Sequence, residues 1–124
     1  MIKKFTNAQI FALSNKLEAA LNAETRYMPA KISYFIHKNR TKLTEQMGFI
    51  EKARVDIIQH YGTMDAVTGA YNVPDEKLDE ANKELSELLN IELDFEISMI
   101  KLSDLDAIEF TLEQMEALSF MIEE

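Results

Sequence analysis

The sequence contains no cysteine and no tryptophan, and only three glycines, two prolines and two histidines among its 124 residues. Without cysteine there is no disulfide, no thiol nucleophile and no sulfur ligand for a metal. No segment approaches the roughly 18 consecutive apolar residues that a membrane-spanning helix needs. The two lysines near the start precede no apolar run of the kind found in signal peptides. We therefore expect a single soluble, non-exported domain without a membrane association.

Basic residues are scarce in the second half of the chain. Residues 1–62 carry ten Lys or Arg against five Asp or Glu, net +5, whereas residues 63–124 carry three against seventeen, net −14. The acidic half would repel phosphates, so the composition argues against a nucleic-acid partner. Two interpretations of the asymmetry stay open: the halves fold against each other and partly neutralise, or the asymmetry marks an interaction surface.

Ten residues near the start are nearly repeated near the end. FTNAQIFALS (5–14) and FTLEQMEALS (110–119) agree at six of ten positions, and both contain the Thr-x-x-Gln pattern of a capping box. We interpret the repeat as one strand-to-helix turn used twice, in which Phe ends a short strand and Thr caps the helix. The two turns are predicted to lie side by side. The matching serines, Ser14 and Ser119, have no base nearby in sequence, which favours structure over catalysis.

A long central helix is predicted from Ala30 to about Tyr61. Pro29 suits the start of this helix, since proline lacks an N–H that would have no partner there. Gly48 is the expected position of a bend, and Gly62 is expected to stop the helix in a left-handed conformation. Apolar residues recur at seven-residue steps along one seam, at Ile36, Leu43, Ile50 and Ile57. Such a seam needs a partner helix, from this chain or from a second copy.

Three further helices and several strands are predicted around this helix. The helices run from the Thr6 cap to about Asn22, from Pro74 to about Asn90, and from the Thr111 cap onward with Leu112 inward. Alternation predicts a strand over 91–99, a second short strand over 102–110 and a turn or hairpin at Thr68-Gly69. The fold class is therefore α+β, a single domain over 1–124, mainly helical, with four helices and a small antiparallel or mixed sheet.

Little in the sequence indicates chemistry. His37 and His60 lie about six turns apart on the predicted long helix, too far for one metal ion. Asp56 and His60 share a face, but no third ligand follows at suitable spacing. The carboxylates are evenly spread, and no glycine-rich loop is present to bind phosphates. We therefore expect no enzymatic activity, no catalytic residue, no metal and no cofactor.

Binding features are stronger, and six charged residues are the candidate partner-binding residues. Three acids point to one side of the predicted strand, and three lysines form a basic edge beside the seam of the long helix. The six are Glu92, Asp94, Glu96, Lys31, Lys38 and Lys42. The lysines are a solvated flank of the helix or neutralise these acids internally, which is favoured over a phosphate-binding edge of a nucleic-acid binder because no aromatic residues are placed to stack on bases. Four apolar residues away from the seam centre mark a protein interface or pack internally: Tyr27, Met28, Tyr34 and Phe49.

The order of these parts resembles a family of small uncharacterised proteins from tailed bacteriophages and prophages. The resemblance rests on KKFTNAQI, KISYFIHKNRTKL with its IEKAR continuation, YGT and the ending IKLSDLDAIEFTLEQMEALSFMIEE. It implies a protein made in the host bacterial cytoplasm and brings no catalytic residues.

This resemblance, together with the binding features and the lack of catalytic motifs, favours a non-enzymatic protein-binding module, such as a virion assembly or structural accessory protein. It would bind a phage or host protein, or itself through the long helix. The alternative is a small acidic inhibitor of a host defence nuclease, whose carboxylates imitate a phosphate backbone.

Overall fold

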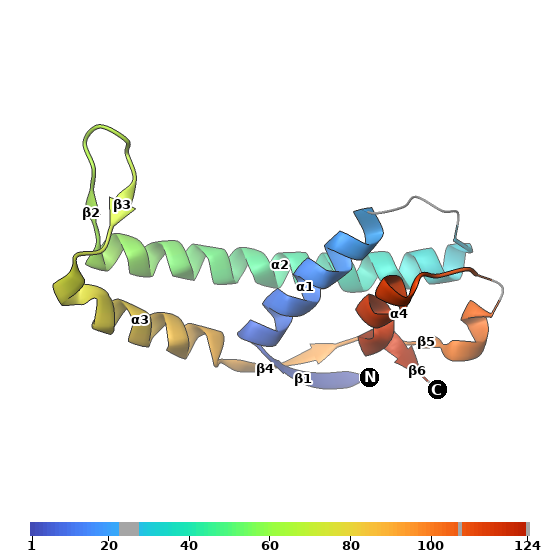
Figure 1. The fold of residues 1–124 in the computed structure, drawn as a ribbon. Coiled ribbons are helices and arrows are strands. Elements are labelled where there is room, and N and C mark those ends of the chain that lie inside the picture. The colour runs from blue at the N-terminus through green and yellow to red at the C-terminus, as the bar shows by residue number, and fades with distance from the viewer. Residues whose placement is uncertain (23–27, 107, 124) are drawn as a thin grey trace.

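A 32-residue helix, α2 (Ala30–Tyr61), runs the length of the molecule in the computed structural model, which describes residues 1–22, 28–106 and 108–123. The helix is roughly 48 Å long at 1.5 Å per residue. Figure 1 shows the other elements along it: α1 crosses α2, and α3 runs beside its C-terminal part. In the described ranges the prediction of a mainly helical α+β fold with four helices is confirmed.

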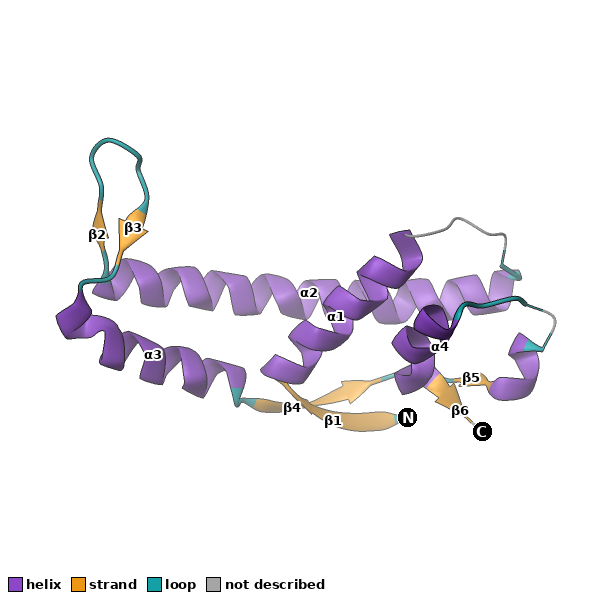
Figure 2. Cartoon of the chain, in the orientation of Figure 1, coloured by secondary structure: helices purple, strands orange, loops and turns teal. Residues whose placement is uncertain are grey.

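The remaining elements are helices, short strands and two 3-10 turns (Figure 2). In chain order they are β1 (Ile2–Thr6), α1 (Asn7–Asn22), β2 (Thr63–Met64), β3 (Tyr71–Asn72), α3 (Asp75–Leu89), β4 (Glu92–Glu96), β5 (Ile100–Lys101), the 3-10 turn η1 (Leu102–Leu105), α4 (Leu112–Leu118), the 3-10 turn η2 (Ser119–Met121) and β6 (Ile122–Glu123).

Gly62 ends α2, but the predicted left-handed conformation is wrong. Its φ of −94° and ψ of 165° are extended. The backbone N–H of Gly62 donates to the carbonyl of Ile58 at 2.7 Å, and a Cβ at position 62 would lie 2.5 Å from that same oxygen. Glycine is therefore needed here because there is no room for a side chain. The left-handed glycine is Gly69, at φ +73° in the loop of the β2–β3 hairpin.

The apolar core lies around the N-terminal two-thirds of α2. Its buried residues come from α1, α2, β4 and the C-terminal segment, among them Ile10, Leu17, Ile36, Leu43, Ile50, Ile97, Leu118 and Met121. Burying these side chains supplies the main drive for folding, about 1.5–3 kcal/mol for each one that is fully buried. The expectation that Leu112 points inward is wrong, since it is 78% exposed. The buried residues of α4 are Gln114, Ala117 and Leu118.

Three two-stranded sheets accompany the helices. β1 pairs antiparallel with β4, with Lys4 opposite Asp94, and β2 pairs antiparallel with β3. β5 and β6 pair in parallel, with Ile100 opposite Ile122. The predicted strand over 91–99 is present over a shorter range, as β4, but the predicted strand within 102–110 is wrong. Its described residues form η1 and a segment that belongs to no helix or strand, and the strand that pairs with β5 is the C-terminal β6.

Both copies of the repeated ten residues form capping boxes. The Thr6 N–H donates to Gln9 Oε1 at 2.8 Å, and the Gln9 N–H donates to Thr6 Oγ1 at 3.2 Å. The Thr111 and Gln114 pair repeats both bonds, at 3.0 and 3.1 Å. Phe5 lies in β1, but Phe110 lies in no strand, so the strand-to-helix interpretation holds for the first copy alone.

The helices that follow these caps pack against each other (Figure 1). Lys16 Nζ of α1 lies 4.0 Å from a carboxylate oxygen of Glu116 in α4. Both side chains are more than half exposed, so this pair adds little stability. The contact between the two helices is therefore held mainly by apolar burial.

Two buried asparagines connect α2 and α1 to other segments of the chain. Asn39, which is fully buried, donates to the backbone carbonyl of Ser98 at 2.8 Å and accepts from the Ser98 N–H at 2.9 Å. Asn7 donates to the Leu88 carbonyl at 2.8 Å and accepts from Gln46 at 3.0 Å. These bonds satisfy polar groups that would be costly to bury alone, and they fix the position of α2 relative to β4 and α3.

Candidate protein-binding surfaces

The first candidate surface is the acidic sheet face, made of Glu92, Asp94 and Glu96. All three side chains are exposed, while Leu93 and Phe95 of the same strand face the core. Alternate residues of a strand are about 6.6 Å apart, so the carboxylates form an evenly spaced row. Within the described residues none of the three takes part in an ion pair, although Lys4 lies across the strand pair from Asp94.

The second candidate surface is the predicted basic edge, whose three lysines lie in different environments in the structure. Lys31 is exposed and lies 3.4 Å from Asp104 Oδ2. Lys38 is exposed, and Lys42 is half-buried with its ammonium donating to the backbone carbonyl of Glu96 at 2.9 Å. In the described ion pairs, these lysines do not neutralise the carboxylates of the acidic sheet face. Lys42 instead helps to hold α2 against β4.

Two aromatic side chains are exposed on the same side of α2 as these lysines. Tyr34 and Phe49 are each 62% exposed. At 100° per residue they fall, with Lys31, Lys38 and Lys52, within an arc of about 60°. We call these five residues the outer face of α2; Glu45 and Asp56 are exposed acids within the same arc. Met28 packs against the core, and Tyr27 lies outside the described residues.

An ion pair fixes α1 against α2. Arg40 Nε and Nη2 donate to the two carboxylate oxygens of Glu18, each at 2.6 Å. This double hydrogen bond lowers the pKa of Glu18 below its usual value and raises the pKa of Arg40. Both side chains are about one-third exposed, so solvent weakens the attraction. The pair therefore orients the helices more than it stabilises them.

The histidines lie apart on exposed positions of α2. The ring of His60 packs edge-on against that of Tyr61, with the ring centres 4.7 Å apart. Partial burial, together with the carboxylates of Glu84 and Glu80, raises the pKa of Tyr61. Among the residues that the structure describes, no group of three His, Asp or Glu side chains is arranged to hold a metal ion.

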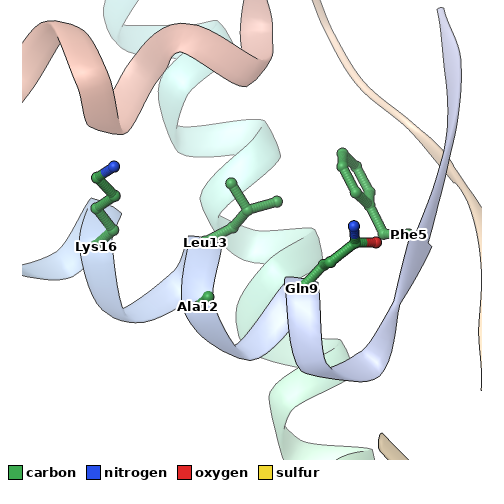
Figure 3. A pocket seen from close by; sticks show the side chains of 5 residues that line it. All are labelled: Phe5, Gln9, Ala12, Leu13 and Lys16. Carbon is green, nitrogen blue, oxygen red and sulfur yellow. The ribbon is translucent and has the colours of Figure 1, made fainter. Parts of the chain in front are cut away.

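The described surface has shallow hollows. One of about 290 Å³ lies beside β1 and α1 and is lined by Phe5, Gln9, Ala12, Leu13 and Lys16 (Figure 3). Another of about 420 Å³ lies between α1, α2 and α3, where Phe11 and Leu89 are partly exposed above Met47 and Ile50. Both are lined mainly by carbon, which suits an apolar side chain of a partner better than a polar metabolite.

Sequence reasoning missed Lys52 and the buried asparagines. Lys52 lies three residues after Phe49 and five turns after Tyr34, so a helical wheel extended past Gly48 would have placed it on the outer face of α2. Asn39 lies three residues after Ile36 and four before Leu43, which is a core position of the seam. A polar residue at such a position indicates a buried amide with backbone partners.

Comparisons with protein-family models, with curated proteins and with solved structures found no match. The described helices include none that is both long and apolar enough to cross a lipid bilayer.

Proposed function

We propose that this protein is a non-enzymatic protein-binding module whose contact surface is the outer face of α2. The observation that carries the proposal is the pair of aromatic side chains, Tyr34 and Phe49, held 62% exposed among lysines on one rigid helix. Aromatic residues are enriched in protein interfaces, where they supply much of the binding energy. The lysines favour a partner with an acidic surface.

The resemblance to phage proteins supplies the biological setting of the proposal. In that setting the module is a virion assembly or structural accessory protein that acts in the host bacterial cytoplasm. A self-association through the outer face of α2 would bring lysine against lysine, which opposes it. The partner is therefore another protein.

The test is affinity purification of the tagged protein from phage-infected and uninfected lysates after nuclease treatment, with partners identified by mass spectrometry. The double variant Tyr34→Ala/Phe49→Ala should lose the partner, because it removes both aromatic contacts. Thr44→Ala, an exposed substitution elsewhere on α2, should retain it. Equal recovery of every protein by the two variants would show that the outer face of α2 is not the contact surface.

A second candidate function rests on the acidic sheet face. Three exposed carboxylates in a row, without an ion pair among the described residues, are suited to the basic groove of a host defence nuclease. Charge neutralisation by Glu92→Gln, Asp94→Asn and Glu96→Gln together should then abolish capture of a host nuclease from uninfected cells, and moderate salt should do the same. Salt-resistant capture that survives this triple variant would exclude the inhibitor.

A further inference from the structure

The outer edge of β1 has backbone groups that β4 does not use. Met1 and Ile97 exchange two backbone bonds, at 3.1 and 2.9 Å, and the Asn7 N–H donates to the Ile91 carbonyl at 3.0 Å. In an antiparallel pair, alternate residues bond to the partner strand. Lys3 and Phe5 therefore bond to β4, opposite Phe95 and Leu93, whereas the even-numbered residues direct their N–H and C=O groups to the other edge.

Part of this edge is already capped. The Thr6 N–H is taken by Gln9 Oε1 in the capping box. Ile2 and Lys4 retain outward-directed N–H and C=O groups, and Ile2 is 69% exposed. Among the described strands, β4 is the one that pairs with β1. The far edge of β4 is different, because Lys42 bonds to the Glu96 carbonyl and Asn39 bonds to both backbone groups of Ser98.

An apolar hollow adjoins the open edge. It begins at Phe5, next to Lys4, and continues over Ala12 and Leu13 of α1 to Lys16. Figure 3 shows the side chains of Phe5, Leu13 and Lys16 on the same side of β1 and α1. Open backbone groups beside a side-chain hollow are the two elements of peptide recognition by strand addition: the backbone bonds give affinity and the hollow gives selectivity.

The side chains of β1 indicate which kind of strand would fit its open edge. Its present partner β4 reads Glu-Leu-Asp-Phe-Glu, with apolar residues facing the core and Asp94 opposite Lys4. A strand on the other edge meets the same β1 side chains in the same alternation. A second copy of β1 fits poorly, because Lys3 and Lys4 would face lysines across the new pair, and like charges opposite each other are destabilising.

We propose that the open edge of β1 binds an extended segment of a partner protein, with apolar residues at alternate positions and an acidic residue between them. The acidic residue lies opposite Lys4, and an apolar residue enters the hollow between Phe5 and Leu13. The inference rests on the proposed role as a protein-binding module but uses a surface separate from the outer face of α2.

The probe is a fluorescein-labelled peptide, Ile-Thr-Leu-Asp-Phe-Thr-Ile, which follows β4 with its two glutamates replaced. Threonine is used there because those glutamates would meet no lysine and would be repelled by Glu92 and Glu96. Fluorescence anisotropy should show saturable binding to the wild-type protein. The matched peptide with Lys in place of Asp should bind about tenfold more weakly or worse, because its charge is repelled by Lys4.

The decisive variant is Lys4→Pro, which removes an outward N–H and leaves the β4 bonds of Lys3 and Phe5 in place. It should weaken peptide binding by about tenfold or more, whereas Lys4→Ala, which keeps the N–H, should weaken it less. Circular dichroism checks that each variant is folded. If Lys4→Pro is unfolded, Ala12→Glu replaces it, because Ala12 is exposed and its new carboxylate would occupy the hollow.

Absence of saturable binding to the wild-type protein would overturn the inference. So would binding that is unchanged by the folded Lys4→Pro or Ala12→Glu variant, since the peptide would then lie elsewhere, for example in the place of β4. Neither result affects the proposed function, which depends on Tyr34 and Phe49. If the Tyr34→Ala/Phe49→Ala variant loses the partner but binds the peptide normally, the outer face of α2 and the open edge of β1 are independent binding surfaces.

Discussion

Between Ile32 and Ile50, α2 has five residues that are less than one-tenth exposed. One of them, Asn39, is hydrogen-bonded to Ser98 through both the nitrogen and the oxygen of its side-chain amide. Beyond Arg54 the inward residues of the same helix are half-buried and pack against α3. The hairpin that follows exposes Val67 to 92%. We call residues 54–89 the arm and the rest of the described chain the body.

The difference between the body and the arm explains why the proposed contact surface, the outer face of α2, is held in place before a partner arrives. All five of its residues lie in the part of α2 that the body holds in place, through buried apolar residues, Asn39 and the Arg40–Glu18 pair. A surface fixed before binding loses little conformational entropy when a partner arrives. The arm contains α3, whose exposed side is acidic, but it is supported by fewer buried side chains.

The largest expected effect on stability comes from removing the buried side-chain amide of Asn39 in the body. Asn39→Ala leaves the N–H and C=O of Ser98 without these bonds and opens a small cavity, so the free energy of unfolding should fall by about 2–4 kcal/mol. Urea denaturation followed by circular dichroism measures it. Thr44→Ala, at an exposed position five residues further along α2, should change it by less than about 0.5 kcal/mol. An equally small effect of Asn39→Ala would mean that the amide bonds do not hold the body.

A Leu→Ala substitution made once in the body and once in the arm compares how firmly the two regions are packed. Leu43 is 1% exposed in the body, and Leu85 is half-buried in the arm. Leu43→Ala should lower the free energy of unfolding by about 3–4 kcal/mol and Leu85→Ala by about 1–2 kcal/mol, because less apolar surface returns to water in the second case. Equal losses would show that the arm is packed as firmly as the body.

The smallest effect is expected from Glu18→Gln, which breaks the charged contact between α1 and α2. Because the pKa of Glu18 is lowered in the folded protein, its contribution is present above its usual value of 4.5 and is lost as the pH falls through the lowered value. With solvent screening the loss at pH 7 should be about 0.5–1 kcal/mol. Denaturation curves at pH 7 and pH 3 give the check: the wild type and variant should converge at acid pH, and a constant difference would contradict the assignment.

Much of this fold could be predicted from short sequence patterns. Thr6 with Gln9, Thr111 with Gln114, and Pro29 and Pro74 mark the helix starts because caps and prolines act over three or four residues. Features set by distant neighbours were missed. The strand that pairs with β5 is β6 and not the segment around Phe110, and Gly62 also lies against the β2–β3 hairpin, where an added Cβ would be 3.3 Å from the Asn72 carbonyl oxygen.

The candidate surfaces divide in the same way. Alternation alone predicts that Glu92, Asp94 and Glu96 share one face, and helical spacing groups Lys31 with Lys38. The role of Lys42 was not accessible, because its bond to the Glu96 carbonyl joins segments 54 residues apart. The open edge of β1 was equally hidden, since it depends on which residues of β1 bond to β4.

Native-state hydrogen exchange, read by mass spectrometry or NMR, compares the two regions most directly. The amides of residues 36–43 should exchange only through global unfolding, whereas those of residues 55–61 should exchange about tenfold faster or more through local opening of the arm. That result would establish that the outer face of α2 is carried by the rigid part of the molecule. Equal protection along the whole of α2, or faster exchange at 36–43, would contradict the account.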